Sequence, residues 1–146
     1  MRKAVRAIII KDDKLLVMNR NKFGKVYDTL PGGNVEIGET LEQALYREVQ
    51  EETQVEFKNH RHVITEHAGD PYGDQFVFLC EYVSGEPTLM PGSEEEHINR
   101  LGQNMYKPMW LSLHSLKDAP FLSETLKQHI LEYHLKGWPA NVVEIS

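Results

Sequence analysis

Short runs of apolar and β-branched residues, separated by polar turns, open the chain and predict β-strands. Two such runs, at residues 2–11 and 15–20, flank a pair of aspartates, so we expect a β-hairpin there. Polar residues 21–25 predict a loop, and residues 26–30 predict a short strand that enters a glycine-rich turn. The beginning of the chain is therefore expected to form β-structure.

From Thr40, the expected N-cap, the apolar residues recur with a helical period and no longer follow a strand pattern. Glu42 places an anion in the first turn, and neither Gly nor Pro interrupts the segment up to Thr53. At roughly 100° per residue, four apolar side chains share a stripe about 140° wide. They are Leu41, Ala44, Leu45 and Val49. The pattern predicts an amphipathic helix with this stripe against the core.

Carboxylates interrupt the apolar stripe. Glu48 and Glu52 project into its middle, and Glu51 lies at its edge. Burying a lone carboxylate costs several kcal/mol, and the helix dipole opposes negative charge near the C-terminus by about 0.3–1 kcal/mol. A solvated acidic face would need paired cations, and only Arg47 stands nearby. Clustered carboxylates without Cys or His instead favour a hard cation, Mg²⁺ or Mn²⁺.

The remainder of the chain adds strands and one helix. Three apolar runs predict strands at 55–66, 75–83 and 107–113. Residues 90–103 are polar and predict an irregular segment. A final helix is expected to begin after its N-cap Ser123 and to end at Gly137. Two helices and about six strands in this order predict an α/β fold, with a mixed sheet between helical layers.

The glycine-rich turn and the first helix carry a distinctive spacing. Gly33 is followed after five residues by Glu39, and after seven more by the run from Arg47 to Val55. This spacing resembles the signature box of the Nudix hydrolases. One specified position differs: Gln54 stands where the family has glycine, the residue that commonly ends a helix in a left-handed conformation.

The resemblance implies a Nudix-type α/β/α sandwich with a mixed β-sheet, formed by residues 1–146 as a single domain. It implies hydrolysis of a diphosphate bond in a nucleoside diphosphate linked to another moiety, with Mg²⁺ as cofactor and Mn²⁺ as a substitute. A nucleoside triphosphate is the first expectation for the substrate. ADP-ribose, a nucleotide sugar or a dinucleoside polyphosphate is the alternative, and so is a non-catalytic domain that senses nucleotides.

The same resemblance implies roles for single residues. The implied metal ligands are Glu48, Glu51, Glu52 and the carbonyl of Gly32. Arg47 would orient these carboxylates, and Glu39 would brace the loop. Either Glu48 or Glu51 would act as the general base.

Further candidates lie outside the helix. Arg20, at the end of its strand, would face the substrate phosphates, and Gly33 would contact the substrate. Pro71 and Tyr72 match features of the ADP-ribose and dinucleoside-polyphosphate branches at once, although they also read as a simple turn. The loop acids Glu94, Glu95 and Glu96 are candidates for an extra metal ligand or base, with a solvated turn as the alternative.

A metal site of another type would involve His60 and His62, which share a strand face. With no third ligand in register, these histidines are expected to be surface residues.

The composition of the chain limits which ligands and binding partners we expect. The formal net charge of −6 argues against a nucleic-acid-binding surface. The single Cys80 excludes an intramolecular disulfide. Without a long apolar run or a signal peptide, we expect a cytoplasmic protein that acts on a small nucleotide and has no membrane partner. The tail from Trp138 either covers a partner subunit in a homodimer or packs on its own domain.

Overall fold

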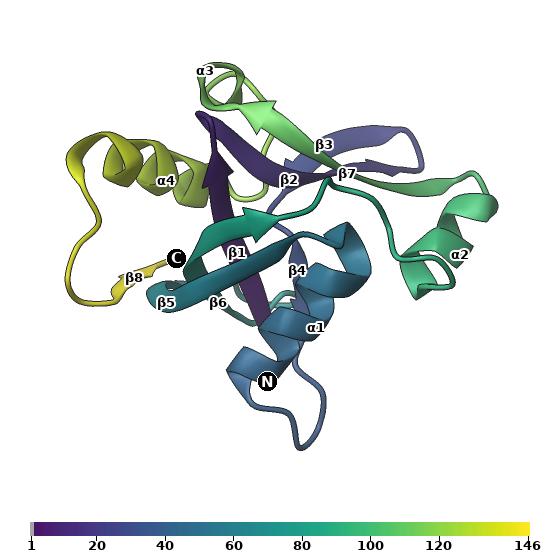
Figure 1. Ribbon diagram of the computed structural model, residues 1–146, viewed down its shortest axis with the longest axis horizontal. Helices are drawn as coiled ribbons and strands as arrows, with labels where there is room; N and C mark the ends of the chain where they lie inside the picture. The colour runs from purple at the N-terminus through teal and green to yellow at the C-terminus, as the bar shows by residue number, and fades with distance from the viewer. Residues whose placement is uncertain (1) are drawn as a thin grey trace.

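The computed structural model describes residues 2–146, which fold around a mixed β-sheet with helices on both faces (Figure 1). The eight strands of this range are β1 (Lys3–Lys11), β2 (Lys14–Lys22), β3 (Lys25–Thr29), β4 (Gly32–Asn34), β5 (Glu56–His67), β6 (Asp74–Ser84), β7 (Asn104–Ser112) and β8 (Val143–Ile145). Its four helices are α1 (Leu41–Thr53), α2 (Glu94–Arg100), α3 (Leu113–Leu116) and α4 (Glu124–Lys136). The predicted α/β/α sandwich is confirmed.

The sheet splits beyond its first hairpin. β1 and β2 pair near their turn, through Ile10 with Leu15 and Lys11 with Lys14, and then diverge. Beyond that point β1 pairs with β4 and, in parallel, with β6, whereas β2 pairs with β3 and β7. The path through the sheet is β3-β2-β1-β6-β5-β8. The divergence separates two strands that begin as neighbours.

Both faces of β1 are buried, which explains its nearly continuous apolar sequence. Alternate residues Val5, Ala7 and Ile9 belong to the apolar cluster that includes α1. Ile8 points the other way and belongs to the cluster that includes α4. The sheet therefore holds α1 with its apolar stripe against the core, as the periodicity predicts.

The ends of α1 are capped by side chains. Thr40 accepts a hydrogen bond from the backbone N–H of Gln43, whose side chain accepts from the N–H of Thr40, which completes a capping box. At the other end Gln54 has φ 55° and ψ 18°, the left-handed conformation that glycine commonly takes there. Its Nε2 donates to the carbonyls of Thr88 (3.3 Å) and Leu89 (3.1 Å). Gln54 therefore ends the helix and also holds a distant loop.

Two segments differ from their predictions. Residues 90–103, expected to be irregular, contain α2. Its N-cap Ser93 accepts from the N–H of Glu96, but none of its residues is buried, so no apolar period marked the helix. Residues 21–25, expected to be a loop, mostly extend β2 and β3 around a tight turn at Phe23. In addition, β4 and α3 are too short to leave a sequence pattern.

The predicted strands and helix after residue 54 are confirmed to within a few residues. β5, β6 and β7 occupy the three predicted strand regions, and α4 begins after Ser123 and ends at Gly137. The tail packs on its own domain, since β8 pairs in parallel with β5 and Trp138 packs against the core cluster under α4.

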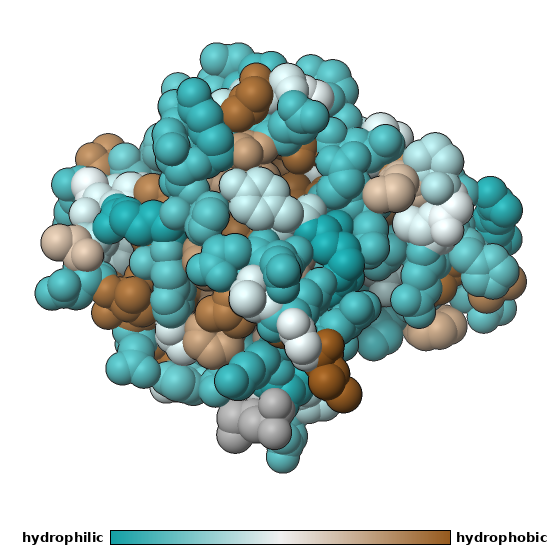
Figure 2. Space-filling view, turned by 60° about the horizontal axis from the view of Figure 1, so that its bottom comes forward, coloured by the Kyte–Doolittle hydropathy of each residue, from teal (hydrophilic) through white to brown (hydrophobic). Residues whose placement is uncertain are grey.

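No helix among residues 2–146 has the length and apolar character needed to cross a bilayer. The face shown in Figure 2 is mostly hydrophilic, with apolar side chains in small separate groups. The assignment of residues 1–146 to one domain, the homodimer and the cytoplasmic location stay predictions.

We expect Gln54→Gly to change the free energy of unfolding by less than about 1 kcal/mol, because two effects oppose each other. Glycine relieves the left-handed strain, whereas loss of the amide removes two hydrogen bonds to the loop. The backbone amides of Thr88 and Met90, which donate to the end of α1, should exchange their hydrogens faster. Urea unfolding and hydrogen exchange measure the two effects. Unchanged exchange at both amides would show that Gln54 does not hold the loop.

Candidate active site

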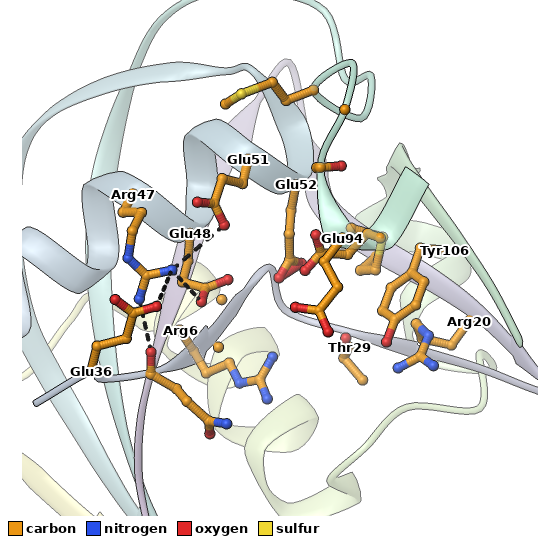
Figure 3. Close-up of a pocket in the computed structure, with 18 of the residues that line it drawn as sticks. Arg6, Arg20, Thr29, Glu36, Arg47, Glu48, Glu51, Glu52, Glu94 and Tyr106 are labelled. Carbon is orange, nitrogen blue, oxygen red and sulfur yellow. Dashed lines mark hydrogen bonds and ion pairs between the residues drawn. The ribbon is translucent and has the colours of Figure 1, made fainter. Parts of the chain in front are cut away.

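A cleft of about 680 Å³ lies where β1 and β2 diverge (Figure 3). Its walls come from α1, β1, β2 and β4, and from the segment that leads into α2. The charged side chains that line it include Arg6, Arg20, Arg47, Glu48, Glu51, Glu52, Glu94 and Glu95. The split in the sheet therefore brings distant parts of the chain together around one polar cavity.

Three carboxylates converge in this cleft. Glu48 and Glu52, one turn apart on α1, are only 8% and 5% exposed, as their position on the apolar stripe predicts. Glu95 reaches them from α2, and one ligand oxygen from each of the three lies within 4.8 Å of the others. Among residues 2–146, this is the one group of three or more potential metal ligands that lies so close together.

Arg47 orients the cluster from one side. Its Nε and Nη2 donate to the two carboxylate oxygens of Glu39, at 2.6 and 2.9 Å, in a bidentate pair. Its Nη1 donates to Oε1 of Glu48 at 2.9 Å, and Nη2 also donates to the carbonyl of Asn34 at 3.0 Å. The Glu39 side of this pair is held in turn by the backbone N–H of Glu36. A rigid guanidinium thus fixes the direction in which Glu48 points.

Gly32 and Gly33 let β4 lie close to strand β1 and to the side chain of Glu48 on α1. A Cβ on Gly33 would lie 2.6 Å from the Glu48 carboxylate, so any side chain there would displace it. Gly32 has φ +150°, and a Cβ on it would lie 1.9 Å from the carbonyl oxygen of Val5. Gly32 and Gly33 both line the cleft. Their predicted contacts with metal and substrate stay predictions.

The electrostatics of the carboxylate cluster favour binding of a cation. Burial raises the pKa of Glu52 well above its usual range, and the neighbouring Glu48 and Glu95 raise it further, against the attraction of Arg6. Burial also raises the pKa of Glu48, although Arg47 opposes this shift. The ionised forms of these carboxylates are disfavoured in such surroundings, and a bound cation would offset that cost.

Arg6 is a member of the cleft that sequence reasoning missed. It lies on β1, where its guanidinium donates to Oε1 of Gln75 (3.0 Å) and to the carbonyl of Leu30 (3.1 Å). Burial lowers the pKa of Arg6, while Glu52 and Glu48 raise it. The available signal was a single charge within the apolar run Ala-Val-Arg-Ala-Ile, where an unpaired cation would be costly.

The donor set fits a hard divalent cation. Oxygen ligands from carboxylates, with no sulfur or imidazole among them, suit Mg²⁺ or Mn²⁺. Glu48, Glu52 and Glu95 would hold such an ion. Glu51 lines the same cleft, but its carboxylate is one-third exposed and lies 3.5 Å from Nη1 of Arg47. The structure therefore groups Glu95 with the two buried acids, and sets Glu51 slightly apart.

Other predicted residues lie at the edges of the cleft or outside it. Arg20 stands at the far end, with its guanidinium 3.7 Å from the centre of the Tyr106 ring. Glu94 also lines the cleft, whereas Glu96 pairs with Arg100 at 2.7 Å. Tyr72 lies outside it, beside two smaller hollows.

The two histidines do not join a metal site in the described part of the chain. A ring nitrogen of His60 lies 3.3 Å from the hydroxyl of Tyr46, and Nε2 of His62 lies 2.9 Å from the hydroxyl of Thr65. Neither belongs to the carboxylate cluster. Both side chains are half-buried and make local structural contacts.

A family model, the NUDIX domain, matches residues 1–131. Among curated proteins, the chain is similar to the NAD-capped RNA hydrolase NudC of Escherichia coli, with 39% identity over 83 residues. The aligned region covers 57% of this chain and 32% of that relative, so the chain spans about a third of the relative's length.

Solved structures share the fold at lower identity. A NUDIX hydrolase from Nitrosomonas europaea superposes with a TM-score of 0.72 at 18% identity, covering 99% of this chain and 78% of that one. MutT, described from Aliivibrio salmonicida and Vibrio cholerae, gives 0.69 at 19%, covering 90% and 97%. An ADP-ribose pyrophosphatase from Streptococcus suis gives 0.68 at 21%, covering 99% and 98%. At these identities the likeness shows the fold alone.

Glu52→Gln should stabilise the metal-free protein and abolish metal binding. The amide keeps the shape of the carboxylate but removes a buried charge, so we expect the free energy of unfolding to rise on the order of 1 kcal/mol. Urea unfolding in EDTA and Mn²⁺ titration by electron paramagnetic resonance measure the two effects. The exposed Glu42→Gln on the same helix is the control and should leave Mn²⁺ binding intact. Lower stability together with normal Mn²⁺ affinity would contradict the assignment.

Proposed function

The chain belongs to the NUDIX family, and from this premise we propose that it hydrolyses a diphosphate bond in a nucleoside diphosphate linked to another moiety, with Mg²⁺ as cofactor. The observation that carries the proposal is the convergence of Glu48, Glu52 and Glu95 in one cleft. A diphosphate resists hydrolysis because its anionic oxygens repel an incoming hydroxide. The chemistry that the ion supplies when bound is neutralisation of that charge and acidification of a water molecule.

Residues of this chain would bind the metal ion and orient its ligands. Glu48, Glu52 and Glu95 would hold the ion, and Arg47 with Glu39 would keep Glu48 in its orientation. Arg47 lines the cleft and donates to both Glu39 and Glu48, so its role is to position these carboxylates.

Glu51 is the better placed of the two predicted general bases. Glu48 already accepts from Arg47 and belongs to the carboxylate cluster, so its oxygens are engaged. Glu51 lines the same cleft outside that cluster, and burial raises its pKa, which strengthens it as a proton acceptor. We therefore assign the base to Glu51.

Cations at the opposite wall would receive the phosphates. Arg6 of β1 and Arg20 of β2 line the cleft across from the helix, with Arg6 nearer the carboxylate cluster and Arg20 at the far end (Figure 3). Guanidinium groups bind phosphate oxygens with directional, charge-assisted hydrogen bonds. A diphosphate would lie between these arginines and the metal site, with its remaining groups toward the outer ends of the cleft.

The substrate class has several members. The first expectation is a nucleoside triphosphate, and the relatives named above include an NAD-capped RNA hydrolase and an ADP-ribose pyrophosphatase. RNA with a 5′ nucleotide cap therefore belongs among the test substrates, despite the acidic composition that argues against nucleic acid. The intact carboxylate cluster supports an enzyme over a non-catalytic sensor of nucleotides.

The deciding experiment is turnover of a substrate panel with Mg²⁺ or Mn²⁺, with both products identified by mass spectrometry in H₂¹⁸O. The panel contains nucleoside triphosphates, ADP-ribose, nucleotide sugars, dinucleoside polyphosphates and a capped RNA. Incorporation of ¹⁸O identifies the phosphorus that is attacked. Absence of turnover with every member would overturn the proposal in favour of a sensing domain.

A matched pair of variants on α2 tests the metal ligand. Glu95→Gln should lower kcat about 100-fold or more, since even outer partners of a metal site cost about 10–100-fold. Glu96→Gln, one residue along, weakens a surface pair with Arg100 and keeps an amide oxygen that can accept from the backbone N–H of Gly92, so it should stay within about twofold of the wild type. Equal activity of the two variants would remove Glu95 from the site.

Glu51→Gln tests the general base. We expect kcat to fall by about 10²–10⁴-fold while Mn²⁺ affinity, measured by electron paramagnetic resonance, changes little. A large loss of Mn²⁺ affinity would make Glu51 a ligand instead.

A further inference from the structure

Glu95 owes its place in the carboxylate cluster to the helix that carries it. In the described part of the chain, its side chain takes part in no hydrogen bond or ion pair that would fix it. One of its oxygens nevertheless lies within 4.8 Å of oxygens of Glu48 and Glu52, and like charges at this distance repel one another. Without a cation, α2 must therefore resist a force that pushes it away from α1.

The packing of α2 provides little of that resistance. The helix is seven residues long, lies at the edge of the molecule beside the start of β7, and buries none of its residues (Figure 1). Its N-cap Ser93 and the surface pair of Glu96 with Arg100 are contacts within the segment itself. A helix of this length is marginal in water unless tertiary contacts fix it. The position of α2 therefore depends on a contact with the sheet.

Asn99 makes that contact. Its Nδ2 donates to the carbonyl of Tyr106 at 2.7 Å, and its Oδ1 accepts from the backbone N–H of the same residue at 2.6 Å. Among residues 2–146, no other side chain of α2 forms a hydrogen bond beyond residues 92–100. The amide thus pairs with β7 as a neighbouring strand would, on the edge that β2 leaves open.

Asn99 and Glu95 share one face of α2. They are four residues apart, so they lie one turn apart along the same side of the helix. The two hydrogen bonds of Asn99 therefore fix the rotation of α2 about its axis, and with it the direction in which Glu95 points. The pair of Glu96 and Arg100 lies about 100° further round, and its side chains bond only to each other and to Gly92.

Helix stability and charge do not account for an asparagine at this position. Asparagine is a poor residue inside a helix, because its side chain competes for backbone hydrogen bonds, and alanine would stabilise the isolated helix. An aspartate of the same shape would attract a cation more strongly. Only a carboxamide offers both the donor and the acceptor that the backbone of Tyr106 requires.

We propose that Asn99 is a positioning residue, which holds α2 against β7 so that Glu95 stands in the metal site before an ion binds. This inference rests on the proposed metal-dependent hydrolysis and names the residue that completes its metal site. The same part of β7 also holds Arg20, whose guanidinium donates to the carbonyl of Met105 at 3.3 Å and lies 3.7 Å from the centre of the Tyr106 ring. Asn99 thereby ties a metal ligand to the strand that fixes a phosphate-binding arginine.

Titration with Mn²⁺, followed by electron paramagnetic resonance, tests this role without turnover. Asn99→Ala should weaken Mn²⁺ binding about tenfold, because the ion must then draw α2 back against the repulsion of the other two acids. Asn99→Asp should weaken it as well, whereas a role through charge alone predicts tighter binding. His97→Ala, an exposed change on the same helix, is the control and should stay within about twofold of the wild type. Urea unfolding should show wild-type stability for all three, since α2 buries none of its residues.

A double-mutant cycle separates the positioning of Glu95 from any other effect of the substitution. In the Glu95→Gln background, Asn99→Ala should change Mn²⁺ affinity by no more than about twofold. Equal losses with and without Glu95 would overturn the proposal, and so would unchanged affinity in Asn99→Ala alone. A wild type that shows the expected Mn²⁺ pattern but hydrolyses no nucleotide would refute the proposed function and still support the role of Asn99.

Discussion

The burial of two carboxylates on the core-facing side of α1 is the constraint on which the rest of the site depends. Glu48 and Glu52 share a stripe with Ala44, Leu45 and Val49, so the packing that holds the helix on the sheet also removes these acids from water. Their pKa values rise for that reason. A fold that places ionised groups there gains from any cation that it binds, and loses stability without one.

Several other features hold these two acids in place. Arg47 binds both Glu48 and Glu39, which lies eight residues before Arg47, and this coupling explains the long fixed spacing between turn and helix. Gly33 is needed because the Glu48 carboxylate occupies the space of a side chain at that position. The far end of the helix contributes too, since Gln54 and the carbonyls of Thr53 and Glu51 bind the loop that leads to Glu95. The cluster is thus supported from both ends of α1.

The split in the sheet decides how far the site extends. Where β1 leaves β2 to pair with β4 and β6, the cleft opens, lined by Arg6 of β1 and Arg20 of β2. The face of β2 and β3 then carries positive charge away from the acidic cluster, to Lys22 and Lys25. A chain with a net negative charge can in this way present a local surface suited to phosphates. Overall charge is a poor guide to a ligand that meets only one face.

Local sequence determined the longer strands, α4 and the acidic helix α1, because periodicity and capping act within a few residues. Glu48 and Glu52 could be placed on the buried face of the helix from their spacing to Val49 and Leu45 alone. The choice of Glu95 among the three candidate acids of its segment depended on tertiary structure, and so did Arg6 and the pairing of Lys22 with Lys25. The short helix that carries Glu95 buries none of its residues and left no pattern, Arg6 reaches the cleft only because β1 and β2 diverge, and the lysines face each other through a strand register. Contacts between segments far apart in the chain decided these positions, and such contacts leave no periodic trace in the sequence.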